Sequence, residues 1–318
     1  MSALTSAEPN PAAREHVQNH PRPSTAPKAR HNAPAGQFSQ RGRLSLSTSL
    51  VLLSPLVILL GVGFFWPIVA LLFQSVSRPT WTAAHYLRLF EEPLYLQVIF
   101  RTIWISVCTV AITLGLAYPI AMLMAQAKGW VAGIIAALVL LPLWTSVLVR
   151  SYGWIVLLQR NGIINNALRD LGMIDRPLSM IYTEGAVLVA MCHVLLPFMI
   201  LPIFSTLRNI SPDLTKAALN LGASRFRAFY SVTLPLSLPG IFAGCLMVFV
   251  LALGFYITPA LVGGPRTLLI ATLISQQATE FLNWPFAGAI STVLLVLSLG
   301  VTIAFKRILG VERAASHG

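Results

Sequence analysis

Six stretches without any Asp, Glu, Lys or Arg constrain the fold of this chain more than any other feature. They cover residues 50–73, 102–127, 129–149, 185–207, 241–261 and 281–305. A helix needs about 20 apolar residues to cross a bilayer core, and a charge at its centre costs at least about 2.5 kcal/mol. The chain is 56% hydrophobic and only 10% charged, whereas soluble domains have roughly 25% charged residues. We therefore expect an all-α integral membrane protein with six transmembrane helices.

Two further apolar segments, residues 151–159 and 267–279, are too short to cross a bilayer. We expect them to form interfacial or re-entrant helices. The chain shows no internal repeat, so nothing in it favours a secondary transporter built from inverted repeats.

Basic residues indicate the orientation of the chain. It has 22 Lys and Arg against 10 Asp and Glu, and cytoplasmic loops of membrane proteins carry an excess of basic residues. With the amino terminus in the cytoplasm, 14 basic residues fall on the cytoplasmic side and 8 on the opposite side. We therefore expect both termini in the cytoplasm. The positive charge then reflects membrane topology, and we expect no nucleic-acid partner.

The amino-terminal segment differs in composition from the rest. Residues 1–44 contain six Pro, six Lys or Arg and two acidic residues, a composition that cannot bury enough apolar surface to fold. We expect a disordered, basic cytoplasmic tail over residues 1–44 and a transmembrane domain over residues 45–318.

The loop between the fourth and fifth stretches carries helix signals at both ends. Ser211 suits an N-cap, Pro212 suits the first helical position, and Gly222 can end the helix in a left-handed conformation. A second short helix is expected from Ser224. The first helix has an apolar stripe at i, i+3, i+4 and i+7, formed by Leu214, Ala217, Ala218 and Leu221. This stripe either packs on the protein's own helix ends or docks into a groove of a separate soluble subunit.

The chain contains Ala217-Ala218, then Gly222 and, after nine intervening residues, Val232-Thr233-Leu234-Pro235. This motif has a long and uneven spacing. It resembles the EAA loop of binding-protein-dependent ABC importer permeases. The departure from the family pattern is Lys216, which stands where that family usually has Glu. This substitution reverses the sign of one contact.

The resemblance implies a fold like that of type I ABC importer permeases, in the bacterial inner (plasma) membrane. The loop at about residues 208–235 would couple this chain to an ATPase subunit. The coupling residues implied are Lys216, Ala217, Ala218, Gly222, Ala223, Arg225, Leu234 and Pro235. The implied partners are two ATPase subunits, membrane lipid, a periplasmic substrate-binding protein and a second permease, with a homologous permease favoured over an identical copy.

Other pieces between about residues 86 and 305 resemble the spermidine/putrescine branch of these permeases. They are Arg101-Thr102, Leu196-Pro197-Phe198, Leu201-Pro202, Thr258-Pro259 and Gly263-Gly264. This resemblance implies a polyamine as the transported solute. Branches that handle thiamine, iron, phosphonates or opine-like solutes share much of the pattern and stay open as alternatives.

The motifs that the chain lacks indicate that its energy comes from elsewhere. None of its glycines is followed by Lys, so a phosphate-binding Gly-Lys-Ser/Thr loop is absent. The chain has no HExxH, CxxC or nucleophile-elbow motif, and we expect a transporter subunit rather than an enzyme. We expect no cofactor or metal on this chain, and ATP with Mg on the partner ATPase. Its cysteines, Cys108, Cys192 and Cys245, are expected to pack as small apolar residues.

A transported cation needs aromatic or polar side chains that face a cavity. Four aromatic residues near prolines or helix ends are candidates for this pathway: Tyr118, Trp144, Tyr152 and Tyr256. Their ring faces could hold an alkylammonium group by cation–π attraction, although Trp and Tyr also concentrate at membrane surfaces for general reasons. Glu184 could hold a cation on entry, or it could form an ion pair with Arg150 or Arg176.

Two further sets of polar residues have equally plausible structural roles. Ser106, Thr109 and Thr113 share one helix face, which fits either a pathway or helix packing. His193 is expected to be a hydrogen-bonded packing residue rather than a metal ligand. Two other functions stay open: an ion-driven secondary transporter, which would need an ionisable residue deep in a span, and a membrane scaffold, which would need the loop but no pathway.

Overall fold

The computed structural model describes residues 46–77 and 81–315. The predicted tail over residues 1–44 lies outside them. Within the described part the chain folds into helices, with short π-helical and 3-10 turns between some of them and no strand. The predicted all-α class is therefore confirmed.

Five helical segments are long and apolar enough to cross a membrane, and there are six if one pair of helices with a 99° bend is counted as a single span. The first span consists of α1 (Leu46–Leu60), the π-helical turn η1 (Gly61–Phe65) and α2 (Trp66–Ser77). The other unbroken spans are α4 (Pro93–Gln126), α8 (Glu184–Asn209), α11 (Leu234–Leu253) and α13 (Trp284–Ala315). The short helix predicted at residues 267–279 is present as α12 (Ile270–Thr279), after the 3-10 turn η4 (Pro265–Thr267).

The predicted third span, residues 129–149, is wrong at its end. Helix α5 (Gly129–Trp144) stops at Trp144, and the chain turns by 99° into α6 (Val147–Leu158) and α7 (Ile163–Asp170). The break occurs because Thr145 and Ser146 adopt extended backbone angles, and the Thr145 hydroxyl donates to the carbonyl oxygen of Pro142 at 2.9 Å. The predicted short helix at residues 151–159 is therefore the second half of α6.

Two other boundaries differ from the predictions. Helix α4 begins at Pro93, well before the predicted residue 102, because a proline suits the first helical position and the outer turns tolerate Arg101. Helix α11 ends at Leu253 rather than at residue 261. Pro259 starts the separate π-helical turn η3 (Pro259–Gly263), since a proline has no N–H with which to continue a helix.

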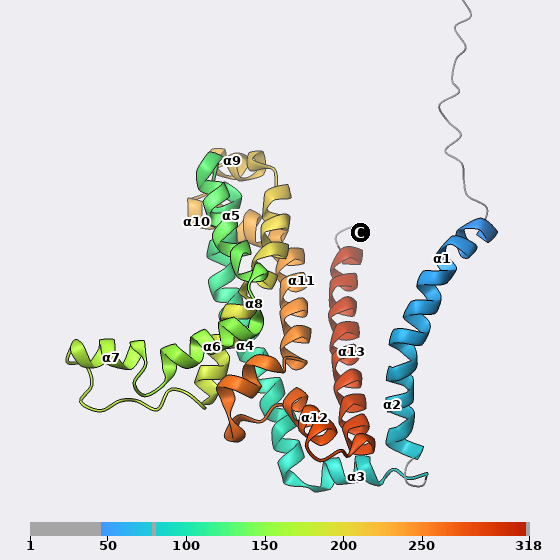
Figure 1. Cartoon of the computed structure of the whole chain (residues 1–318). Helices are drawn as coiled ribbons and strands as arrows, with labels where there is room; N and C mark the ends of the chain where they lie inside the picture. The colour runs from blue at the N-terminus through green and yellow to red at the C-terminus, as the bar shows by residue number, and fades with distance from the viewer. Residues whose placement is uncertain (1–45, 78–80, 316–318) are drawn as a thin grey trace, which may run out of the picture. The chain divides into compact units, whose positions relative to one another are not determined.

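The core lies where α4, α8 and α11 pack together (Figure 1). Helix α8 is the most buried span, and its side chains Met191, Leu195 and Met199 are almost fully enclosed. Helix α11 approaches α8 closely at Gly244. A Cβ atom there would lie 3.2 Å from the carbonyl oxygen of Met199, so this glycine permits the close contact.

A second group of helices packs around α13. Helices α2 and α3 (Ala84–Glu91) both contact α13. The hydroxyl of Tyr86 on α3 lies 2.7 Å from the Ser75 hydroxyl of α2 and 3.3 Å from the Thr292 hydroxyl of α13. This short chain of hydroxyl groups ties the three helices together.

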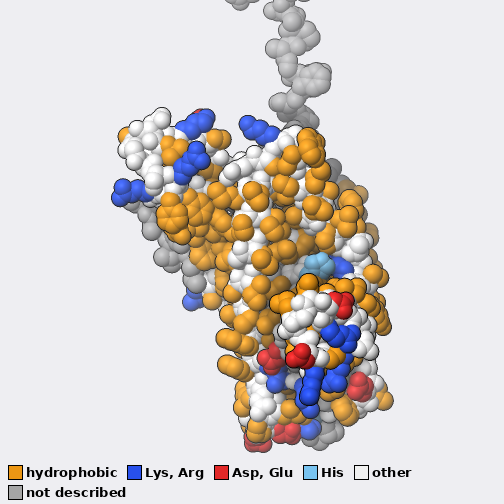
Figure 2. All heavy atoms as spheres, turned by 90° about the vertical axis from the view of Figure 1, so that its left-hand side faces the viewer, with side chains coloured by type: hydrophobic (Ala, Val, Ile, Leu, Met, Phe, Trp, Pro, Cys, Tyr) orange, Lys and Arg blue, Asp and Glu red, His pale blue; other side chains and the backbone are white. Residues whose placement is uncertain are grey.

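Charged side chains are concentrated at the two ends of the spans. Helices α9 (Pro212–Asn220) and α10 (Arg225–Ala228) lie at one end of α4, α8 and α11, and α3 and α12 lie at the other (Figure 1). Figure 2 shows Lys and Arg near one end, a mixed group of acidic and basic side chains in the lower half, and hydrophobic side chains between them. This distribution matches a protein whose middle part faces lipid.

The hydroxyl side chains of α4 serve packing. Ser106, Thr109 and Thr113 are buried, and each hydroxyl donates to the carbonyl oxygen four residues earlier at 2.6–2.7 Å. The Thr102 hydroxyl also accepts from the backbone N–H of Ile270, at the start of α12. The packing interpretation is therefore supported. Cys108, Cys192 and Cys245 are all free, and the latter two are buried.

Candidate functional site

Helix α9 forms because its sequence supplies both ends. The Ser211 hydroxyl accepts the N–H of Asp213 at 3.3 Å, and Pro212 occupies the first turn. Asp213 also lies near the positive end of the helix dipole. At the other end Gly222 has φ +85°, and the N–H of Ala223 donates to Ala218 O at 3.1 Å. The N–H of Gly222 donates to Leu219 O at 3.0 Å, which completes a Schellman motif.

The predicted apolar stripe of α9 is not covered by the rest of the chain. Leu214 is 48% exposed and Leu221 is 88% exposed, and no residue of α9 is buried. Phe226 on the neighbouring α10 is 73% exposed. Large apolar side chains gathered on an exposed loop usually mark an interaction surface. Of the two interpretations of the stripe, docking on a separate subunit is therefore the better supported.

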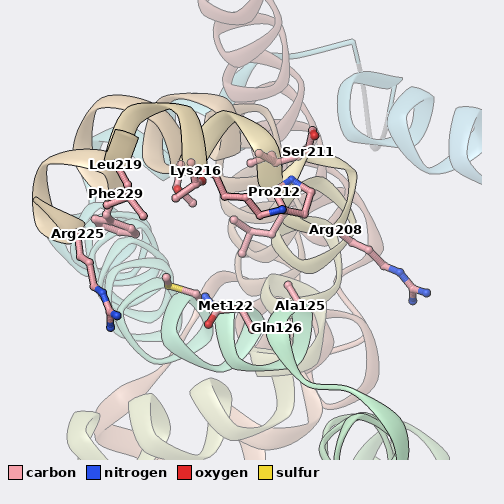
Figure 3. Close-up of a pocket in the computed structure, with 14 residues that line it drawn as sticks. Met122, Ala125, Gln126, Arg208, Ser211, Pro212, Lys216, Leu219, Arg225 and Phe229 are labelled. Carbon is pink, nitrogen blue, oxygen red and sulfur yellow. The ribbon is translucent and has the colours of Figure 1, made fainter. Parts of the chain in front are cut away.

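A cavity of about 620 Å³ lies beneath α9. Its walls are contributed by the ends of α4 and α8, by α9, and by the π-helical turn η2 (Phe229–Thr233) that connects α10 to α11 (Figure 3). Met122, Ala125 and Gln126 face it from α4, and Lys216 and Leu219 face it from α9. Arg208 and Arg225 extend outward at its two sides. The space separates α9 from the end of α4.

The electrostatics of this segment are basic. Residues 208–227 contain Arg208, Lys216, Arg225 and Arg227 but only one acid, Asp213. Lys216 Nζ lies 2.9 Å from Asp213 Oδ1, with 69% and 81% of these side chains exposed. Such an exposed pair adds little stability because solvent screens it. We call residues 208–230 the coupling segment; Leu234 and Pro235 of the predicted coupling set begin α11.

The residues predicted for a pathway lie on several elements. Trp144 ends α5 and is 87% exposed, Tyr152 lies on α6, and Tyr256 follows α11. Tyr118 instead contacts α11 and η2, through Ser237 and Phe229. Among the described residues, no hydrogen bond or ring contact joins any two of these four aromatic residues.

Glu184 forms an ion pair, but with a partner that the sequence did not suggest. Its Oε1 lies 2.9 Å from Arg101 Nε on α4. Neither Arg150 nor Arg176, the two expected partners, makes this contact. Arg101 was missed because its span was expected to begin after it.

His193 of α8 and Arg150 of α6 are two charged or polar residues near the contact between these helices. The indole N–H of Trp154 donates to His193 Nδ1 at 3.3 Å, and His193 also lines an apolar groove of about 390 Å³ between α4, α5 and α8. Two guanidinium nitrogens of Arg150 are buried without a hydrogen-bond partner. No sequence motif marks this arrangement. Within the described ranges, no group of His, Cys, Asp and Glu side chains could hold a metal ion.

Comparison with known proteins agrees with this architecture. Residues 117–309 match the model of the family "Binding-protein-dependent transport system inner membrane component". The spermidine/putrescine transport system permease protein PotB of Haemophilus influenzae is 38% identical over 226 residues, 71% of this chain and 79% of that protein. The inner membrane ABC transporter permease protein YdcU of Escherichia coli is 33% identical, over 83% of this chain and 90% of its own length.

Solved structures show the same fold. A bacterial alginate ABC transporter in complex with alginate pentasaccharide-bound periplasmic protein contains a chain with a TM-score of 0.68 and 19% sequence identity. The alignment covers 82% of this chain and 93% of that chain. With the family match over residues 117–309, these similarities show that the chain is a multi-pass permease of the inner membrane and belongs to the family of binding-protein-dependent transport system inner membrane components.

Proposed function

We propose that this permease imports a polyamine, with spermidine and putrescine as the first solutes to test. The support is the identity to PotB proteins, which is 38% for the Haemophilus influenzae protein and 34% for the Escherichia coli protein. Both relatives are named for spermidine and putrescine transport.

The single observation that carries the ATP-driven mechanism is the exposed, capped helix α9. Its ends are formed by local hydrogen bonds, and its apolar stripe is uncovered. A rigid helix of this kind suits a cleft in a separate soluble subunit. Two ATPase subunits bind ATP and Mg, and their closure moves the coupling segments of this chain and of a second, homologous permease. The pathway between the two permeases then opens toward a periplasmic substrate-binding protein.

This arrangement places both termini and the coupling segment in the cytoplasm. The charge distribution supports that orientation, since the coupling segment has four basic residues and one acid. The opposite end then carries α3 and α12, where a binding protein delivers the solute. The tail over residues 1–44 lies on the cytoplasmic side as well.

Selectivity for a cation cannot come from charge in this chain alone. Glu184 is the only acid in the described spanning helices α2, α4, α5, α8, α11 and the part of α13 up to Arg307, and Arg101 already compensates it. Trp144, Tyr152 and Tyr256 are exposed in the isolated chain and can offer ring faces to an alkylammonium group. The partner permease and the binding protein supply the remaining selectivity.

Reconstitution tests the proposal. The complete assembly of this permease with its cognate ATPase, second permease and binding protein is placed in vesicles loaded with ATP. Uptake of radiolabelled spermidine should require ATP and the binding protein, and excess thiamine should not compete. Uptake by the permeases without the ATPase would contradict ATP coupling. ATP-dependent uptake of radiolabelled thiamine, with no uptake of spermidine, would contradict the polyamine assignment.

A further inference from the structure

Tyr118 on α4 contacts η2 and α11, the two elements that follow α10. Its hydroxyl lies 3.0 Å from Ser237 Oγ on α11. Its ring meets that of Phe229 in η2 edge to face, with centroids 5.8 Å apart and planes at 81°. One side chain of α4 is therefore joined to α11 by a hydrogen bond and to η2 by an aromatic contact.

The direction of the hydrogen bond follows from its surroundings. Ser237 Oγ donates its single proton to the carbonyl oxygen of Leu234, at 2.8 Å. Tyr118 must then donate to Ser237, which can only accept at that point. Ser237 is fully buried, so water does not compete for the bond. The phenol hydroxyl is held in one position against the first turn of α11.

A row of aromatic rings leads from the exposed loop to this tyrosine. The ring of Phe226 on α10 lies 4.7 Å from that of Tyr230, and the ring of Tyr230 lies 5.2 Å from that of Phe229. Phe229 then contacts Tyr118. Phe226 is exposed and Tyr118 is partly buried, so the row runs from the surface of the coupling segment into the membrane domain. Aromatic side chains have few rotatable bonds and move as stiff units.

The α4 side of the contact is a place where that helix can bend. Pro119 follows Tyr118 inside α4, and a proline removes the backbone hydrogen bond to the carbonyl four residues earlier. Beyond it, Met122 and Gln126 lie one and two turns after Tyr118 and face the cavity beneath α9. That cavity leaves this end of α4 with little direct contact to α9. Tyr118 thus lies beside a missing backbone hydrogen bond of α4 and contacts Phe229 of η2.

We propose that Tyr118 is a positioning residue that transmits displacement of the coupling segment to α4. Movement of α9 and α10 displaces Phe229 in η2. Tyr118, in contact with Phe229, then displaces α4 beside Pro119. The hydrogen bond from Tyr118 to Ser237 makes α11 move with α4. This inference rests on the proposed ATP-driven function. Tyr118 then acts on the coupling of ATP hydrolysis to transport rather than on solute binding.

Two substitutions test the hydrogen bond. Tyr118→Phe removes the donor and keeps the ring, and Ser237→Ala removes the acceptor. In vesicles containing the complete assembly, each variant should transport about fivefold less spermidine per ATP hydrolysed. This factor corresponds to the usual net free energy of one hydrogen bond. The Michaelis constant for spermidine should stay unchanged. The double variant should be no worse than either single variant, because both remove the same bond.

Matched controls separate coupling from folding. The Ser298 hydroxyl donates to the carbonyl three residues earlier, as the Ser237 hydroxyl does, but it lies on α13 away from the coupling segment. Ser298→Ala should leave the amount of spermidine transported per ATP hydrolysed unchanged. The amount of copurified ATPase and the thermal midpoint report assembly and folding. If the wild-type assembly transports spermidine and Tyr118→Phe keeps its transport ratio, Tyr118 is not the link. If both variants only lower the midpoint, with an intact ratio, their role is structural and the inference is wrong. If the wild-type assembly shows no ATP-dependent uptake, the proposed function itself has failed.

Discussion

The Arg101–Glu184 ion pair joins the outer turns of α4 and α8, with 29% and 45% of the two side chains exposed. Partial exposure limits what such a pair contributes, and about 1 kcal/mol is the upper range for pairs in water. Because Arg101 already balances the carboxylate, Glu184→Gln should have only a small effect on spermidine binding. The Michaelis constant for spermidine should rise by less than about fivefold, the factor that corresponds to about 1 kcal/mol. Uptake kinetics in vesicles measure this constant. A tenfold or larger rise, with an unchanged thermal midpoint, would show that Glu184 holds the entering cation despite Arg101.

The partner of Glu184 shows what residue-level reasoning from sequence can reach. An ion pair was one of the two roles expected for this acid at the start of a span, and Glu184 forms one. The identity of that partner depends on how α4 packs against α8, and on α4 beginning at Pro93. Neither fact is encoded locally around Glu184. Arg150 and Arg176, the partners expected from their positions in the sequence, were therefore the wrong choice.

At the scale of single elements, the end of α9 gives a clear test. Gly222 has φ +85°, yet a Cβ atom there would meet nothing within 4 Å. A substitution is therefore opposed by the backbone conformation alone, at about 1–2 kcal/mol for an ordinary residue. Gly222→Val should reduce the amount of ATPase that copurifies with the permease, because α9 loses its defined end. Gly222→Asn should retain most of it, since Asn tolerates this conformation. Equal losses in both variants would mean that the glycine serves close contact with the ATPase instead.

The contact between α8 and α11 gives a second test at this scale. A Cβ atom on Gly240 would lie 2.7 Å from the backbone carbonyl oxygen of Pro202, so the two helices would have to separate. We expect Gly240→Ala to lower the free energy of unfolding by about 1–3 kcal/mol, as overpacked cores do. Gly254→Ala is the matched control, because a Cβ atom at the end of the same helix meets nothing within 4 Å. Thermal unfolding in detergent compares the two, and equal midpoints would show that α8 and α11 adjust freely.

The elements that were predicted well carry their signals within their own sequence. Helix α8 lies within two residues of its predicted bounds, and α9 begins and ends at its predicted caps. The break after α5 had no such signal, since neither Thr145 nor Ser146 is a glycine or proline. It depends on tertiary contacts of α6, where the Ser151 hydroxyl lies 2.9 Å from that of Thr258 and Trp154 bonds to His193. Periodicity and charge cannot reveal contacts of this kind.

At the scale of the whole molecule, the central question left by the sequence was what covers the apolar stripe of α9. The periodicity alone left both internal packing and external docking open, because it reports one apolar face and not its neighbour. The fold leaves the stripe exposed, at the end of the bundle where basic residues gather. From an exposed apolar stripe amid positive charge, we expect a partner with an apolar cleft that has an acidic border.

Lys216 offers a direct test of this expected charge complementarity with the ATPase. Residues 208–227 have four basic residues and one acid, so Lys216→Glu should weaken binding of the cognate ATPase by about fivefold or more at low salt, with a smaller difference at high salt. Lys306→Glu on α13 makes the same charge change at an exposed site outside this segment and should have little effect. Binding is measured by titrating labelled ATPase onto the permease assembly in nanodiscs. If Lys216→Glu instead tightens binding, the ATPase cleft is basic there, and the charge of this segment opposes the contact.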